Sequence, residues 1–187
     1  PTIFAYITGG NRSAVAGAEI ILKGEAYGLK KKPLENARYL WNFGDGGAKE
    51  GKSVGHAYVY PGSYIAVLNV SSGYESTQVN IVVSVIPNQV EISEVAPGGR
   101  SWIELENGSD KQVDISRWVL ESADKKFFFP EATFIRPQAY LTVPFEISGL
   151  EILPGAGFLK LLYPNGQTAN HFAYGGLLKE GESFVKN

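Results

Sequence analysis

The stretch that decides the fold reads Trp41-Asn42-Phe43-Gly44-Asp45-Gly46 and continues with His56-Ala57-Tyr58 and Pro61-Gly62-Ser63-Tyr64. Trp41 and Phe43 take alternate positions, which predicts a strand that sends both side chains into one core. Gly44 and Gly46 on either side of Asp45 favour a tight turn with positive φ angles. The aromatic segment from His56 onward and the Pro-Gly turn after it then predict two further strands.

Short strands account for most of residues 1–87. Period-two patterning predicts strands at residues 2–7, 18–26, 38–43, 64–70 and 78–86, with a turn at Gly9-Gly10-Asn11 and an exposed basic loop at 28–36. No apolar set keeps a 3.6-residue period over a useful length, which excludes a buried helix. Strands that follow one another this closely predict an antiparallel sandwich.

These motifs resemble the PKD domain, an immunoglobulin-like β-sandwich common in extracellular and cell-surface proteins. The resemblance implies that Trp41 is a core residue and that His56 packs and hydrogen-bonds at its strand. Asp45 is expected to organise the turn through the nearby backbone. The structural motif comprises Trp41, Phe43, Gly44, Asp45, Gly46, His56, Tyr58, Pro61, Gly62 and Tyr64.

Two alternatives stay open for this motif. Trp41 could stack on a carbohydrate instead of entering the core. Asp45 could bind a cation, since PKD domains of some secreted proteases bind calcium. Calcium is usually held by several carboxylates close together, and the acidic residues of the first half form no dense cluster. No cofactor is therefore expected, and calcium is the one ion considered.

A second strand pattern starts at Val90, so residues 87–89 are predicted to link two domains. It contains Trp102-Ile103-Glu104-Leu105-Glu106-Asn107-Gly108, then Val113-Asp114-Ile115-Ser116-Arg117-Trp118-Val119-Leu120. A proline-bounded strand at 135–143 and a hairpin at 159–166 follow. This order resembles the lamin tail domain, another immunoglobulin-like sandwich. The resemblance places Trp102 and Glu104 on a strand, implies a buried Trp118 and predicts a closing strand at 180–184.

Composition and motifs exclude several classes of function. A net charge of −2 gives no case for a concentrated basic surface, so nucleic acid is not expected as a partner. Cysteine is absent, which removes disulfides and thiolate chemistry. His56 and His171 are the only histidines and fall in different halves, which argues against a zinc site. There is no P-loop, no G-x-S-x-G motif and no apolar run near the roughly 20 residues of a membrane span.

Two groups of residues are candidate contact surfaces. Glu104 and Glu106 share a strand face with Trp102 in an acidic concentration that also includes Glu91 and Glu94. This face is either a display surface or the solvated side of a half-buried sheet. In the run Phe127-Phe128-Phe129, a strand must point at least one ring outward, and Phe128 is the candidate contact residue.

The predicted fold is all-β, with two immunoglobulin-like sandwiches in tandem: a PKD-like domain at 1–87 and a lamin-tail-like domain at 90–187. The resemblances imply a non-catalytic spacer, adhesion or interaction region of a secreted or surface-anchored prokaryotic protein. Its location would be extracellular or at the cell surface, and its partner a protein or surface polymer. The alternative is a substrate-targeting module of an extracellular hydrolase or nuclease.

Overall fold

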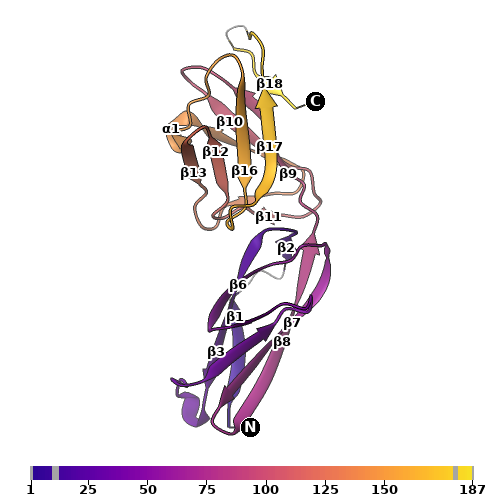
Figure 1. Cartoon of the computed structure of the whole chain (residues 1–187), viewed down its shortest axis with the longest axis vertical. Coiled ribbons are helices and arrows are strands. Elements are labelled where there is room, and N and C mark those ends of the chain that lie inside the picture. The colour runs from indigo at the N-terminus through magenta and orange to yellow at the C-terminus, as the bar shows by residue number, and fades with distance from the viewer. Residues whose placement is uncertain (1, 10–12, 179–180, 187) are drawn as a thin grey trace. The chain divides into compact units, whose positions relative to one another are not determined.

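The chain divides into two compact units, Pro1–Pro87 and Asn88–Asn187 (Figure 1). A computed structural model describes residues 2–9, 13–178 and 181–186. Each unit is built mostly of strands arranged in more than one sheet, and the expectation of an all-β fold is confirmed. Within the described residues, no helix is long and apolar enough to cross a membrane.

The first unit contains a five-stranded sheet in the order β2-β8-β7-β4-β5 and a three-stranded sheet in the order β1-β3-β6. Its elements are β1 Phe4–Gly9, β2 Ser13–Val15, β3 Glu19–Tyr27, the 3₁₀ turn η1 Leu29–Lys31, β4 Arg38–Asn42, β5 Ala48–Glu50, β6 Ser53–Ala57, β7 Gly62–Ser72 and β8 Glu75–Ile86. The β7–β8 hairpin pairs without interruption from Gly62 opposite Val85 to Ser72 opposite Glu75. This hairpin is the longest paired segment of the unit.

The core of the first unit lies between its two sheets. Trp41 and Phe43 are completely buried there, together with Leu22 from β3 and Leu68 from β7. These residues belong to the inward rows that the alternation in the sequence predicted. Burying a side chain of this kind stabilises the fold by about 1.5–3 kcal/mol, so the inward rows define which face of each strand is committed to the core.

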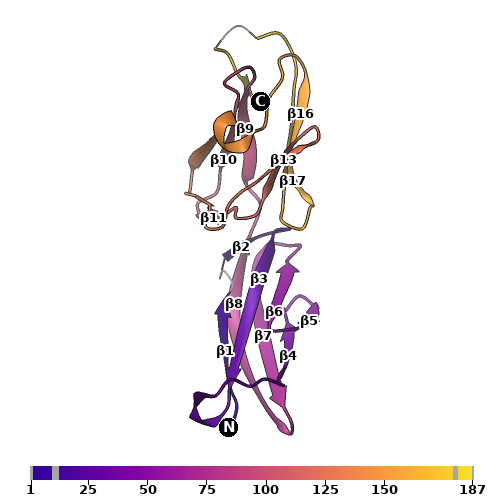
Figure 2. The ribbon, with the colours of Figure 1, turned by 90° about the vertical axis from the view of Figure 1, so that its left-hand side faces the viewer.

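The second unit also has two main layers, which Figure 2 shows apart from one another. One sheet has the order β15-β10-β9-β18 and the other β13-β12-β16-β17, with a small β11-β14 pair beside them. The elements are β9 Val90–Ala96, β10 Trp102–Asn107, β11 Val113–Asp114, β12 Val119–Ser122, β13 Lys125–Phe128, β14 Phe134–Ile135, β15 Ala139–Pro144, α1 Phe145–Ser148, β16 Gly157–Leu162, β17 Thr168–Tyr174 and β18 Phe184–Val185.

A buried amide fixes one end of the second unit. Asn107 is fully buried at the end of β10, and its Nδ2 donates to the carbonyls of Lys111, Ile135 and Arg136 at 2.8, 3.1 and 3.0 Å. Its Oδ1 accepts hydrogen bonds from Ser109 N–H and Oγ–H. One side chain therefore bonds the backbone of the loop after β10 and of the segment at the end of β14.

The structure departs from the sequence predictions at several points. The strand expected at 135–143 is two strands, because Pro137 cannot donate to a ladder and Gln138 has φ 50°. The loop at 28–36 contains η1 and an isolated bridge between Tyr27 and Pro33. Strand β2 pairs in parallel with β8 and was not predicted. The turn predicted at Gly9-Gly10-Asn11 falls partly on residues 10–12, outside the described residues.

Replacing Asn107 by alanine is expected to destabilise the second unit by about 2–4 kcal/mol, because several buried carbonyls lose their donor at once. Chemical denaturation monitored by tryptophan fluorescence measures this loss. Asn165→Ala is the matched control: its Oδ1 accepts a hydrogen bond from Gln167 N–H in an exposed turn, and a loss of about 1 kcal/mol or less is expected. Equal losses in the two variants would contradict the role of Asn107.

Candidate functional site

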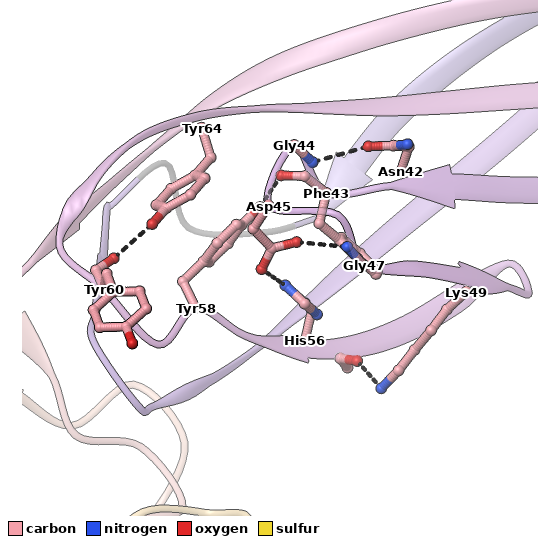
Figure 3. A network of polar contacts seen from close by, with 11 residues as sticks. Asn42, Phe43, Gly44, Asp45, Gly47, Lys49, His56, Tyr58, Tyr60 and Tyr64 are labelled. Carbon is pink, nitrogen blue, oxygen red and sulfur yellow. Dashed lines mark hydrogen bonds and ion pairs between the residues drawn. The ribbon is translucent and has the colours of Figure 1, made fainter.

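The Gly44-Asp45-Gly46 turn is stabilised by hydrogen bonds between residues of the turn and those beside it (Figure 3). Phe43 N–H donates to Gly47 O at 3.0 Å, and Gly47 N–H donates to Asp45 Oδ1 at 3.0 Å. Gly44 has φ 83°, and a Cβ atom at this position would lie only 2.7 Å from the carbonyl oxygen of Ile65. Glycine is therefore required at position 44 by both the backbone angle and the closeness of β7.

Asp45 and His56 form a pair that joins this turn to β6. The second carboxylate oxygen of Asp45 lies 2.7 Å from His56 Nε2 (Figure 3). The His56 ring lies flat on Phe43, with ring centroids 3.8 Å apart and an interplanar angle of 5°. Tyr58 meets the His56 ring edge-on at 4.7 Å. The sequence predicted a turn-forming Asp45 and a packed His56, but it gave no register that would bring the two together.

The titratable groups of this network, Asp45, His56 and Tyr58, form hydrogen bonds that stabilise the turn. Burial disfavours the charged form of Asp45, but the hydrogen bond from Gly47 N–H and the contact with His56 outweigh it and lower the pKa of the carboxyl group. Tyr58 Oη donates to Phe43 O at 3.1 Å, and burial raises the pKa of Tyr58 to about 12. Among the described residues, no group of three or more histidine and acidic side chains is placed to hold a metal ion.

The remaining motif residues of the first unit lie in the core or make contacts within the unit. Trp41 is completely buried, and its Nε1 donates to Gly51 O at 3.0 Å, so its ring is not available to a carbohydrate. Pro61 and Gly62 lead into β7, where the Tyr64 ring stacks on Tyr58 with centroids 4.4 Å apart.

In the second unit, Trp118 is buried as the resemblance implied, and its ring meets Tyr163 edge-on at 4.8 Å. Trp102 is half-buried at the start of β10, on the same face as Glu104 and Glu106. The sequence alternation already separated the two tryptophans, because it put Trp102 on the face that carries Glu104 and Glu106.

The acidic face occupies the outer side of the sheet that contains β9 and β10. The cross-strand pairs place like charges next to each other, at Glu94 opposite Glu104 and Glu91 opposite Glu106. Each of these carboxylates has a polar partner within the unit. Ser183 bonds to Glu94 and Ser93 to Glu104. Lys186 pairs with Glu91, and Tyr140 bonds to Glu106. A bulge at Ser93 interrupts the register of these two strands. These contacts are those of a solvated, internally paired sheet face.

Phe128 points outward from β13, an edge strand of its sheet, and is 64% exposed. Its cross-strand neighbour Val119 belongs to the same face. The next row on this face is an ion-pair row, in which Glu121 lies 2.9 Å from Lys126 Nζ and 3.1 Å from Lys160 Nζ. These two lysines lower the pKa of the Glu121 carboxyl. Phe128 thus forms an apolar contact point beside a paired polar row.

A second group of exposed aromatic side chains was missed by the sequence analysis. Phe4 and Tyr6 point outward from β1, and Tyr27 of β3 is the cross-strand neighbour of Phe4. The Tyr6 and Tyr27 rings meet edge-on with centroids 6.0 Å apart. The signal was present, because the alternation in residues 2–7 puts Phe4 and Tyr6 on the same face of the predicted strand.

Both units are β-sandwiches of the immunoglobulin-like class, each with a buried tryptophan in its core. Residues 5–85 match the PKD domain and residues 86–150 match the Lamin Tail Domain. The chain therefore carries a PKD domain followed by a lamin tail domain. Both matches are to non-catalytic domain families. The second unit continues beyond the matched residues with β16, β17 and β18.

Three solved structures resemble the chain. One is described as the structural basis for the promiscuous specificity of carbohydrate-binding modules from the β-sandwich superfamily, with 16% identity, TM-score 0.42, and coverage of 86% of this chain and 58% of that chain. A chimeric titin Z1Z2 tandem functionalised with a GRGDS peptide from fibronectin has 13% identity, TM-score 0.32, and coverage of 94% and 99%. Trypsin-activated α-2-macroglobulin from Escherichia coli has 11% identity, TM-score 0.29, and coverage of 98% and 17%.

This chain thus spans less than two thirds of the length of the first of these structures. Structural similarity at this level carries no information about a ligand. No curated protein matches the chain.

Replacing Gly44 by alanine is expected to cost about 1–3 kcal/mol more than replacing Gly46 by alanine. Both glycines have positive φ, at 83° and 93°, but only a Cβ at position 44 would collide with the backbone of Ile65. Urea denaturation of the two variants measures the difference. A loss for Gly46→Ala as large as that for Gly44→Ala would show that the backbone angle alone, and not the approach of β7, requires glycine.

Replacing Asp45 by asparagine is expected to lower the free energy of unfolding by about 1–2 kcal/mol at pH 7. Because the pKa of Asp45 is lowered in the folded state, its contribution is complete above the ordinary aspartate pKa of about 4 and decreases as the pH falls through the folded-state value. The gap between wild type and variant should therefore narrow toward pH 2. Denaturation at a series of pH values tests this.

Glu75→Gln is the control for that series, since Glu75 is exposed in the β7–β8 hairpin. It should change the free energy of unfolding by less than about 0.5 kcal/mol. A gap between wild type and Asp45→Asn that is the same at pH 7 and near pH 2 would rule out a contribution from the ionised carboxyl group.

Proposed function

We propose that this chain is a non-catalytic interaction region of a secreted or surface-anchored prokaryotic protein, in which the two sandwiches act as spacer and as adhesion modules. One observation carries the proposal. The motif residues that could have bound a ligand or catalysed a reaction make contacts within the fold, while large aromatic side chains are exposed on outer sheet faces. Asp45 and His56 bind each other in a turn, and Trp41 and Trp118 are buried. Phe128 is exposed on an edge strand.

The surface around Phe128 supports this function by its composition. An exposed aromatic ring supplies a large apolar contact area with few rotatable bonds, which lowers the entropy cost of binding. The adjacent Lys126–Glu121–Lys160 row is paired within the protein, so it offers polar contacts at the edge of the surface without a strong net field. A protein or a surface polymer fits such a surface better than a highly charged ligand does.

The alternative function is that of a targeting module which brings an extracellular hydrolase or nuclease to its substrate. The same exposed aromatic side chains favour it, because insoluble polymers are commonly held on flat surfaces. The two functions differ in what else the full protein contains, and both require that this chain binds a polymer or protein by itself. An antibody against the chain that labels intact cells of the source organism would support its placement outside the cell.

The Phe128→Ala variant is expected to weaken binding to the target by about tenfold, since a central aromatic contact is commonly worth at least 1.4 kcal/mol. The full chain is mixed with insoluble cellulose, chitin, peptidoglycan and collagen fibres, and the bound fraction is measured by depletion from solution. Phe134→Ala is the control, because Phe134 is also exposed but lies on β14.

Three outcomes decide between the functions. Binding that depends on Phe128 but not on Phe134 supports an interaction role at this face. Absence of binding to every polymer contradicts adhesion and targeting together. Hydrolysis of any of these polymers, or of DNA, by the purified chain would contradict the non-catalytic assignment.

A further inference from the structure

The outer side of the β1-β3-β6 sheet in the first unit carries a compact aromatic surface. We call Phe4, Tyr6 and Tyr27 the aromatic face. Phe4 and Tyr6 are 42% and 52% exposed, and Tyr27 is partly exposed behind them. The core of the unit does not use these side chains, because Ile3 and Ala26 of the same segments point inward and are buried. Three neighbouring aromatic side chains in contact with water require another explanation than packing.

Two rings of the aromatic face, Tyr6 and Tyr27, are held by contacts within the protein before any ligand binds. Tyr27 Oη donates to Glu25 Oε2 at 2.5 Å, and this hydrogen bond raises the pKa of Tyr27 above its ordinary value. Tyr6 lies edge-on against Tyr27 on the paired β1–β3 ladder. A surface that is already ordered loses little conformational entropy on binding.

Hydrogen-bonding groups border the rings on one side. A shallow depression of about 370 Å³ adjoins Tyr27 and is lined by Thr8, Lys23, Glu25, Pro33, Lys52 and Ser53. One carboxylate, two ammonium groups and two hydroxyl groups thus lie within one surface. The charges of both signs are close together, so the surface has no strong preference for an anion or a cation.

This combination identifies the chemistry of the ligand. Flat aromatic rings accept the C–H face of a pyranose ring, and carboxylate, ammonium and hydroxyl groups can bond to its hydroxyls. Nucleic acid would require a concentration of basic residues, and Glu25 would repel its phosphates. A stable protein interface would require a larger apolar centre with fewer charges.

We propose that the aromatic face binds a chain of neutral hexopyranose sugars. This inference deepens the proposed function and rests on it, because it names the class of polymer that one of the two units recognises. It concerns residues of the first unit only, so it is independent of Phe128 and its surroundings.

The test uses the full chain and soluble polysaccharides in affinity gel electrophoresis, with isothermal titration calorimetry for any polysaccharide that retards the protein. Neutral hexopyranose probes are hydroxyethyl cellulose, barley β-glucan and galactomannan; anionic probes are carboxymethyl cellulose and polygalacturonate. At least one neutral probe should retard the wild type. Tyr6→Ala should raise the dissociation constant tenfold or more, while Tyr6→Phe should change it about threefold or less, because the ring is kept.

Tyr74→Ala is the matched control, since Tyr74 is a fully exposed tyrosine in the turn between β7 and β8 of the same unit. Equal thermal melting temperatures for all variants establish that they fold. Equal affinities of Tyr6→Ala and Tyr74→Ala for a bound neutral probe, or retardation by anionic probes alone, would overturn the inference. If insoluble polymers bind through Phe128 but no neutral probe binds the aromatic face, this inference fails and the proposed function stands. If nothing binds in either assay, both fail.

Discussion

A strand in a two-layer sandwich can give only one of its two side-chain rows to the core, and this constraint determines where the protein can make contacts. In β7 the inward row contains Ala66, Leu68 and Val70, all buried, whereas Ile65 of the outer row is exposed. The same division holds for β10, where Ile103 and Leu105 face inward. The side chains available to a partner therefore lie on outer rows and loops, whose composition the core does not dictate.

The same architecture also explains why polar side chains occur inside each unit. Where strands end, backbone N–H and C=O groups lose their ladder partners and must be satisfied by other means. Asp45 does this for the turn after β4, and Asn107 does it for the loops beside β10. Asp45 and Asn107 are residue types often found in active sites, but here their polar atoms are hydrogen-bonded to the backbone of turns and loops. A pocket around either of them would expose the groups that they satisfy.

The sequence supports the fold better than it supports the site. Period-two patterns were sufficient for the long strands β3, β4, β7 and β8, because each fills one face of a core. They failed for β2, which has only three residues and pairs in parallel with a strand far along the chain. The Asp45–His56 contact needed the register between two segments that no local pattern supplies. Phe4 and Tyr6 follow from alternation alone, as Phe128 does, because every second residue of the first strand lies on its outer face.

Exposure by itself does not mark a binding surface, since isolated apolar side chains are common on soluble proteins. Tyr74 and Leu177 are more exposed than any member of the aromatic face, but each lies outside the strands. The aromatic face differs in three physical respects: its residues are neighbours on two paired strands with the Tyr6 and Tyr27 rings in contact, Tyr27 is fixed by Glu25, and polar side chains border it. Contiguity supplies area, fixation lowers the entropy cost, and the polar border supplies orientation. A side chain that meets only the first of these conditions would bind weakly, and one that meets none contributes only to solvation.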